Sequence, residues 1–159
     1  NLQIALYLEK YLGSNGANVI LTRNGDYDLS SPNAKYRKKS DFDNRIKLIN
    51  SSNADMYVSI HLNYLSDGAY FGPQVFFEGK NEEMATTIQS VMNEYLNGDR
   101  KVKKIPNDTY MYNKLKVDGV LIECGFLSNK KERELLNSPD YQKKVALSIS
   151  EGIIEYFAI

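Results

Sequence analysis

The sequence predicts an α/β protein: a single domain with a mostly parallel central sheet and helices on both faces. Short apolar runs, each typical of a buried strand, alternate along the chain with segments whose apolar residues recur at helical spacing. The length of 159 residues suits one domain. With 42% hydrophobic and 25% charged residues, the composition is that of a folded protein rather than a disordered one.

Helices are expected where apolar residues recur every three or four positions and capping residues mark the ends. Ser40 or Asp41 is expected to cap the second helix. Asn129 and Glu132 have the spacing of an N-cap and its reciprocal partner, and Ser138 precedes the last helix. The main helical segments are residues 2–12, 42–49, 82–96 and 139–157.

Strands are expected at four short apolar runs bounded by glycine or polar residues. These runs are residues 17–22, 56–61, 74–78 and 120–124. Segments rich in Asn, Asp, Ser, Gly and Pro are expected to be loops. The predicted loops are residues 23–40, 62–72 and 98–107.

Residues 56–63 contain the only histidine of the sequence. Apolar side chains alternate there with Ser59, His61 and Asn63, so these three polar side chains share one face of the predicted strand. Buried polar groups are usually hydrogen-bonded structure. The alternation is therefore compatible with a polar cluster in the core or with a functional site.

Glu123 lies inside a second apolar run, where a carboxylate is unusual without a partner. If both strands are parallel, His61 and Glu123 lie at neighbouring carboxyl ends, where open α/β sheets bind ligands. Glu123 is either paired with a cation such as Arg45 or functional. Cys124 is expected on the opposite face of the strand from Glu123.

Three roles for this pair are open. His61 could hold a metal while Glu123 exchanges protons with a water molecule. Cys124 with His61 could form a nucleophile and its base. The groove could also bind a ligand without catalysis. The metal interpretation is incomplete, because a catalytic zinc needs about three protein ligands and no carboxylate has convincing spacing to the single histidine.

Composition excludes several other classes. Lys plus Arg equals Asp plus Glu at 20 each, which argues against a nucleic-acid binder. One cysteine cannot form an internal disulfide. No apolar run reaches the length of a transmembrane segment.

Three segments, read in order, resemble one known family. They are residues 16–23, residues 53–63 with Ser-x-His-x-Asn, and residues 121–129 with Glu-Cys-Gly-Phe-Leu-Ser-Asn. Together with residues 141–157 they are similar to the zinc-dependent N-acetylmuramoyl-L-alanine amidases of bacteria. Residues 119–129 and 141–157 look most like the branch that trims spore cortex peptidoglycan during germination.

The resemblance implies roles for individual residues. His61 matches a zinc ligand, with one Zn²⁺ per intact protein, and Glu123 matches the catalytic glutamate that handles the attacking water. Asn63 is a candidate substrate contact, although it and Ser59 are expected mainly to orient the region around His61. Aromatic residues of the loops are candidates for glycan and stem-peptide contact, or for ordinary packing: Tyr27, Tyr36, Tyr64, Tyr70 and Phe71.

The family pattern also has a first strand with a zinc-binding histidine, and a glutamate ligand before the position of Asn1, and neither matches here. Residues 1–159 are therefore expected to be an amidase catalytic domain lacking its first strand, with the remaining zinc ligands outside this chain and no activity of its own. The expected substrate is peptidoglycan, a protein partner is possible, and the expected location is extracytoplasmic, at the cell envelope or spore cortex. The alternative is a non-catalytic or partner-dependent peptidoglycan-binding module.

Overall fold

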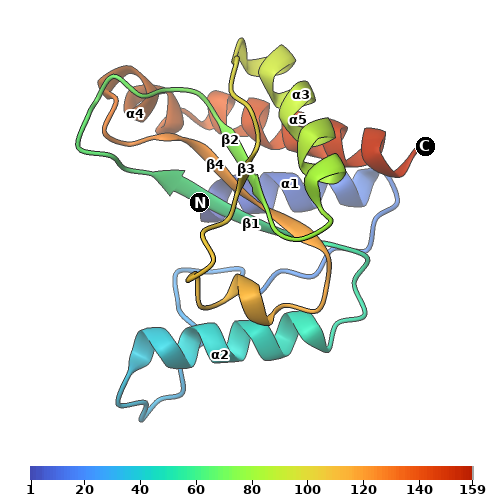
Figure 1. Ribbon diagram of the computed structural model, residues 1–159, viewed down its shortest axis with the longest axis vertical. Helices are drawn as coiled ribbons and strands as arrows, with labels where there is room; N and C mark the ends of the chain where they lie inside the picture. The colour runs from blue at the N-terminus through green and yellow to red at the C-terminus, as the bar shows by residue number, and fades with distance from the viewer. Residues whose placement is uncertain (159) are drawn as a thin grey trace.

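A four-stranded mixed sheet lies at the centre of the computed structural model, which describes residues 1–158 (Figure 1). The strands lie side by side in the order β1-β4-β2-β3. β1 and β4 are parallel, β4 and β2 are antiparallel, and β2 and β3 are parallel. The strands are β1 (Tyr57–Asn63), β2 (Gln74–Phe77), β3 (Lys103–Lys104) and β4 (Gly119–Phe126). The predicted α/β class with a mostly parallel sheet is confirmed.

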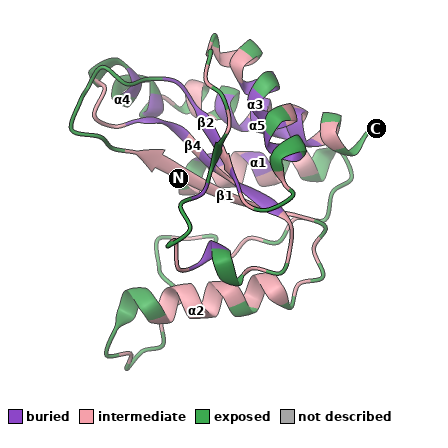
Figure 2. Cartoon of the chain, in the orientation of Figure 1, coloured by how far each residue is buried: buried purple, intermediate pink, exposed green. Residues whose placement is uncertain are grey.

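Helices cover both faces of the sheet, as predicted, but unequally. Figure 1 shows α1, α3 and α5 together on one side and α2 alone on the other. Figure 2 shows the buried residues concentrated in the sheet, α3 and α5, whereas α2 has none. The helices are α1 (Leu2–Ser14), α2 (Arg37–Asn50), α3 (Glu82–Leu96), α4 (Lys130–Leu136) and α5 (Pro139–Phe157), with a 3₁₀ turn η1 (Tyr112–Lys114).

The alternation along the strands divides the sheet into two chemically different faces. The apolar side chains of β1 pack against the main core, together with the fully buried Val120, Ile122 and Cys124 of β4. The opposite face meets a smaller cluster formed by Ile105, Met111 and Tyr112. Because side chains alternate between faces, the polar residues of β1 are directed toward this smaller cluster.

The predicted boundary of the second helix is wrong. α2 begins at Arg37, inside the predicted loop, and its N-cap is Tyr36. Ser40 and Asp41 serve the loop before the helix instead: the backbone N–H of Ser31 donates to Ser40 Oγ at 3.0 Å, and that of Leu29 donates to Asp41 Oδ1 at 2.8 Å. Side chains expected to cap helical amides therefore satisfy loop amides.

The strand predicted at residues 17–22 does not form. An isolated extended segment cannot satisfy its backbone groups without a neighbouring strand, and no strand of residues 1–158 pairs with it. Ile20 is 51% exposed, whereas a core strand would bury it. The apolar composition of residues 17–22 is typical of a strand, but composition does not show whether a partner strand is available. β3 shows the reverse case, a two-residue strand inside a predicted loop.

Of the two hydrogen bonds predicted for the cap of α4, one forms and the reciprocal one does not. Asn129 is the N-cap, and its Oδ1 accepts a hydrogen bond from the Glu132 N–H at 3.2 Å. The Glu132 carboxylate does not return to Asn129. It accepts instead from the backbone N–H groups of Gly72, at 2.9 Å, and Phe126, at 2.8 Å. Glu132 thus joins a loop to the end of β4.

None of the helices within residues 1–158 combines the length and the apolar character needed to cross a membrane.

Candidate active site

His61 and Glu123 lie side by side on the polar face of the sheet. They are register partners in the parallel pairing of β1 with β4, and Gln74 of β2 is the register partner of Glu123 on its other side. Partners in adjacent strands direct their side chains to the same face. Hydrogen bonding between two strands thus brings together two ionisable groups that are far apart in the sequence.

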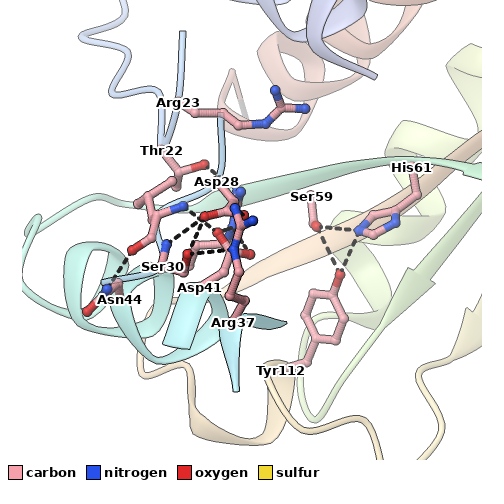
Figure 3. A network of polar contacts seen from close by, with 12 residues as sticks. Thr22, Arg23, Asp28, Ser30, Arg37, Asp41, Asn44, Ser59, His61 and Tyr112 are labelled. Atoms are coloured by element: carbon pink, nitrogen blue, oxygen red, sulfur yellow. Dashed lines mark hydrogen bonds and ion pairs between the residues drawn. The ribbon is translucent and has the colours of Figure 1, made fainter. Parts of the chain in front are cut away.

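Two hydroxyl groups surround one nitrogen of the His61 ring. Nε2 lies 3.1 Å from Ser59 Oγ and 3.1 Å from Tyr112 Oη, and the two hydroxyl oxygens are 2.9 Å apart (Figure 3). Burial, together with the positive charge of Arg45, lowers the pKa of His61. The imidazole is therefore neutral at neutral pH, which is the form that ligates metals.

The Glu123 carboxylate has no ion-pair partner within residues 1–158. Its Oε2 atom is buried and makes no hydrogen bond there, and burial raises its pKa to about 7. A carboxyl group with a pKa near neutrality can both take up and release a proton under working conditions, which is the requirement for a general acid or base. The environment of Glu123 is that of a reactive group.

Arg45 is not the partner of Glu123. Its Nε donates to Asp41 Oδ2 at 2.9 Å, and its Nη1 donates to Thr22 Oγ1 at 3.0 Å. The side chain thus ties α2 to the segment before the loop, and Figure 3 shows Thr22 and Asp41 within one polar network. The structural explanation of Glu123 as the buried half of an ion pair with Arg45 is wrong.

Cys124 faces away from His61, as the alternation along the strand predicts. It is fully buried in the main core on the opposite face. Burial raises its pKa to about 12, so the thiolate that a nucleophile requires is absent at neutral pH. The geometry gives no support to a cysteine–histidine pair.

Ser59 and Asn63 lie in different surroundings. Ser59 contacts the His61 ring and so orients it. Asn63 lies beyond an irregularity in the pairing of β1 with β4, and its carbonyl accepts from the Leu127 N–H at 2.8 Å. The role of Asn63 in substrate binding stays a prediction.

Tyr112 is the residue of this site that sequence reasoning missed. It belongs to η1, in a segment without clear periodicity, and is separated from His61 by 51 positions. No spacing rule connects two residues at that distance. Only the packing of the smaller cluster, in which Tyr112 is 6% exposed, brings its hydroxyl to the histidine.

A shallow, charged cavity of about 420 Å³ lies beside the loop that precedes α2. Its wall includes Arg45, whose charge acts on His61, and Arg37, which pairs with Asp28. The full lining is Arg23, Asp26, Tyr27, Asp28, Arg37 and Arg45. Of the residues that line this cavity, Arg45 is the one whose positive charge lowers the pKa of His61 and favours its neutral form.

The described residues fit part of a zinc site. His61 is a neutral nitrogen donor, and Glu123 is an unpaired carboxyl group beside it. Within residues 1–158, however, no three His, Cys, Asp or Glu side chains converge as a metal site needs. A catalytic zinc takes about three protein ligands, so these residues alone do not complete one.

Comparison with known proteins agrees with this arrangement. The model of the family described as N-acetylmuramoyl-L-alanine amidase (Amidase_3) matches residues 1–155, nearly the whole chain. The chain belongs to this family. It is therefore an amidase that acts on peptidoglycan, and amidases of this family are generally zinc-dependent.

Relatives in sequence and structure support the same assignment. A germination-specific N-acetylmuramoyl-L-alanine amidase of Bacillus subtilis is 44% identical over 98% of this chain and 68% of its own length. The CwlD amidase of Clostridioides difficile, solved in complex with the GerS lipoprotein, superposes with a TM-score of 0.93 at 36% identity, covering 99% of this chain and 84% of that one. The catalytic domain of the amidase CwlV from Bacillus (Paenibacillus) polymyxa gives 0.83 at 28% identity, covering 99% and 83%. The first two relatives support the expected placement of this chain near the germination-specific members of the family.

Proposed function

We propose that this amidase hydrolyses the bond between N-acetylmuramic acid and L-alanine of the stem peptide, with Glu123 as the group that moves the proton. One observation carries the proposal: a buried, unpaired carboxylate oxygen of Glu123 lies beside the only histidine, on neighbouring strands. Amide hydrolysis requires a proton to leave the attacking water and another to reach the departing amine. A carboxyl group whose pKa is raised to about 7 by burial suits both transfers.

His61 is proposed as one ligand of a catalytic zinc. A bound zinc supplies Lewis-acid activation of the water and of the scissile carbonyl. The neutral His61 ring suits a ligand role. Because residues 1–158 contain no group of three potential ligands, the remaining ligands are proposed to lie outside these residues, and this chain is proposed to form the larger part of the catalytic domain.

Exposed aromatic residues are proposed to contact the glycan or the stem peptide. Tyr36, Tyr64 and Phe71 are 67%, 72% and 56% exposed. Two other candidates have structural contacts that explain them. Tyr70 stacks on Phe126 with ring centroids 6.0 Å apart, and the Tyr27 hydroxyl donates to Asn24 within its own loop.

The similarity to the germination-specific relative leads us to propose that this amidase acts outside the cytoplasm, on spore cortex peptidoglycan. The structure of CwlD was solved with the GerS lipoprotein. By that likeness, a protein partner is proposed for this chain as well. Asn63 remains proposed as a substrate contact, on the strength of its place at the end of β1.

The test of Glu123 is its replacement by glutamine in the complete natural protein, with release of stem peptide from peptidoglycan as the measurement. Glutamine keeps the shape but cannot exchange the proton, so a loss of about 10²- to 10⁴-fold in the rate is expected. Glu134→Gln, on the exposed surface of α4, is the matched control and should leave the rate unchanged. Activity of Glu123→Gln within a few fold of wild type would contradict its role.

Metal analysis of the same preparations distinguishes the amidase from a peptidoglycan-binding module. We expect about one zinc per complete chain, from the single catalytic site that the family chemistry needs, and loss of hydrolysis after chelation. A protein that still binds peptidoglycan but holds no zinc under any condition would favour the binding module instead.

A further inference from the structure

Tyr112 reaches the candidate active site from an element that has no other part in it. Its ring lies against that of Tyr57, with centroids 6.2 Å apart, and belongs to the smaller core cluster. The ring is therefore held by packing, and its hydroxyl is delivered to a fixed position. That position is 3.1 Å from His61 Nε2 and 2.9 Å from Ser59 Oγ.

These three atoms can form hydrogen bonds in two ways, and the tautomer of the His61 ring decides between them. Two hydroxyl oxygens already lie within hydrogen-bond distance of this nitrogen. One hydroxyl can donate to the other, which leaves an oxygen lone pair to accept a hydrogen bond from the ring. A neutral imidazole has two tautomers. In the other tautomer the proton is on Nδ1, and Nε2 accepts a hydrogen bond from one of the hydroxyl groups. Only the first arrangement leaves Nδ1 with a free lone pair.

We propose that Tyr112 is a positioning residue for His61: together with Ser59 it holds Nε2 in its protonated form, so that Nδ1 is the nitrogen available to a metal. The proposal rests on the proposed role of His61 as a zinc ligand. A histidine that ligates a metal through one nitrogen donates its other N–H to a nearby acceptor, which fixes both the tautomer and the orientation of the ring. The hydroxyl pair provides that acceptor on this chain.

Tyr112→Phe tests the proposal, because it removes only the hydroxyl and keeps the packed ring. In the metal-free complete protein, long-range ¹⁵N–¹H NMR reports which ring nitrogen carries the proton, and the His61 signals are identified by their loss in His61→Gln. Wild type should show His61 protonated at Nε2. Tyr112→Phe should show a mixture of tautomers, and its zinc affinity should fall about 10- to 100-fold.

Tyr110→Phe is the matched control. Tyr110 lies in the same segment, but its hydroxyl donates to Asp43 Oδ1 at 2.6 Å and does not contact His61. This variant should keep both the wild-type tautomer and the wild-type zinc affinity. Unfolding by urea checks that both variants are folded at the temperature of the NMR measurement.

Two outcomes overturn the positioning role: wild-type His61 protonated at Nδ1, or a Tyr112→Phe protein whose tautomer and zinc affinity equal those of wild type. Failure of the proposed function is recognised separately. If the complete protein binds no zinc at all, the ligand role of His61 fails, whereas the NMR measurement on metal-free protein still reports the effect of Tyr112 on the ring.

Discussion

Glu123 and Glu132, two glutamates close together in the sequence, have opposite environments. Glu132 is 7% exposed and accepts hydrogen bonds from two backbone N–H groups, those of Gly72 and Phe126. Glu123 has a buried oxygen that accepts none from residues 1–158. A satisfied carboxylate stabilises the structure, whereas an unsatisfied one is costly to ionise and is therefore poised to hold a proton. Residue type alone does not distinguish the two.

The raised pKa of Glu123 predicts how the stability of the metal-free protein depends on pH. Its pKa is raised from 4.5 to about 7 on folding, so between these values the folded state binds more protons than the unfolded state. The free energy of unfolding should therefore fall as the pH rises through this window and level off above it. Urea denaturation at several pH values measures the effect.

Glu123→Gln is the control, because it cannot ionise. His61, whose pKa is lowered by burial, contributes with the opposite sign in the acid range, so the difference between wild type and Glu123→Gln isolates the glutamate. That difference should change in favour of the variant as the pH rises from about 4.5 to about 7. A difference independent of pH would show that Glu123 is not desolvated in the folded protein.

At the scale of elements, α3 and α5 contribute many of the buried residues of the main core. Six residues of α3 and seven of α5 are buried, and together they cover the apolar face of the sheet. Gly152 allows the close approach of the two helices, since a Cβ atom built on it would lie 2.8 Å from Ile88 Cα. The opposing atom belongs to the backbone and cannot rotate away.

Gly152→Ala should therefore destabilise the protein by about 1–3 kcal/mol through overpacking. Gly13→Ala is the matched control: it also lies in a helix, and a Cβ atom there meets nothing within 4 Å. That change should be neutral or should stabilise by up to about 1 kcal/mol, because alanine loses less backbone entropy than glycine in a helix. Urea denaturation of both variants measures the free energies of unfolding, and equal effects would contradict the close helix contact.

At the scale of the whole molecule, the candidate site lies between a well-packed half and a less packed one. β4 is hydrogen-bonded on both sides and packs against the main core, whereas α2 on the other face has no buried residue. Figure 2 shows this difference directly, with buried segments in β4, α3 and α5 and partly exposed ones in α2. Glu123 belongs to β4, in the well-packed half of the molecule. The smaller cluster, which contains Tyr112, lies on the other side of the site.

Hydrogen exchange should follow this division. Amides of β4 and α5 should exchange only through the most costly opening of the protein, whereas those of α2 and of the loop before it should exchange earlier, because few buried contacts are lost when they open. Exchange measured by NMR or mass spectrometry gives the order. Uniform protection across α2 and α5 would mean that the two faces unfold together.

The sequence by itself determined the elements with strong local patterns. The helix predicted at residues 82–96 is α3 with the same bounds, and the alternation along β1 correctly separated its apolar residues from Ser59, His61 and Asn63. Local spacing decides these features, because a helix or strand repeats over a few residues. The motifs around His61 and Glu123 were also enough to indicate the amidase family, which the family comparison confirmed.

Tertiary structure alone decided which groups meet and which remain unpaired. Residues 17–22 had the composition of a strand but no strand to pair with. Arg45 had the charge to neutralise Glu123, yet it bonds Asp41 and Thr22. Tyr112 contacts His61 across 51 positions of sequence. Burial and hydrogen bonding depend on neighbours from distant parts of the chain, and it is these neighbours that raise the pKa of Glu123 and orient the His61 ring.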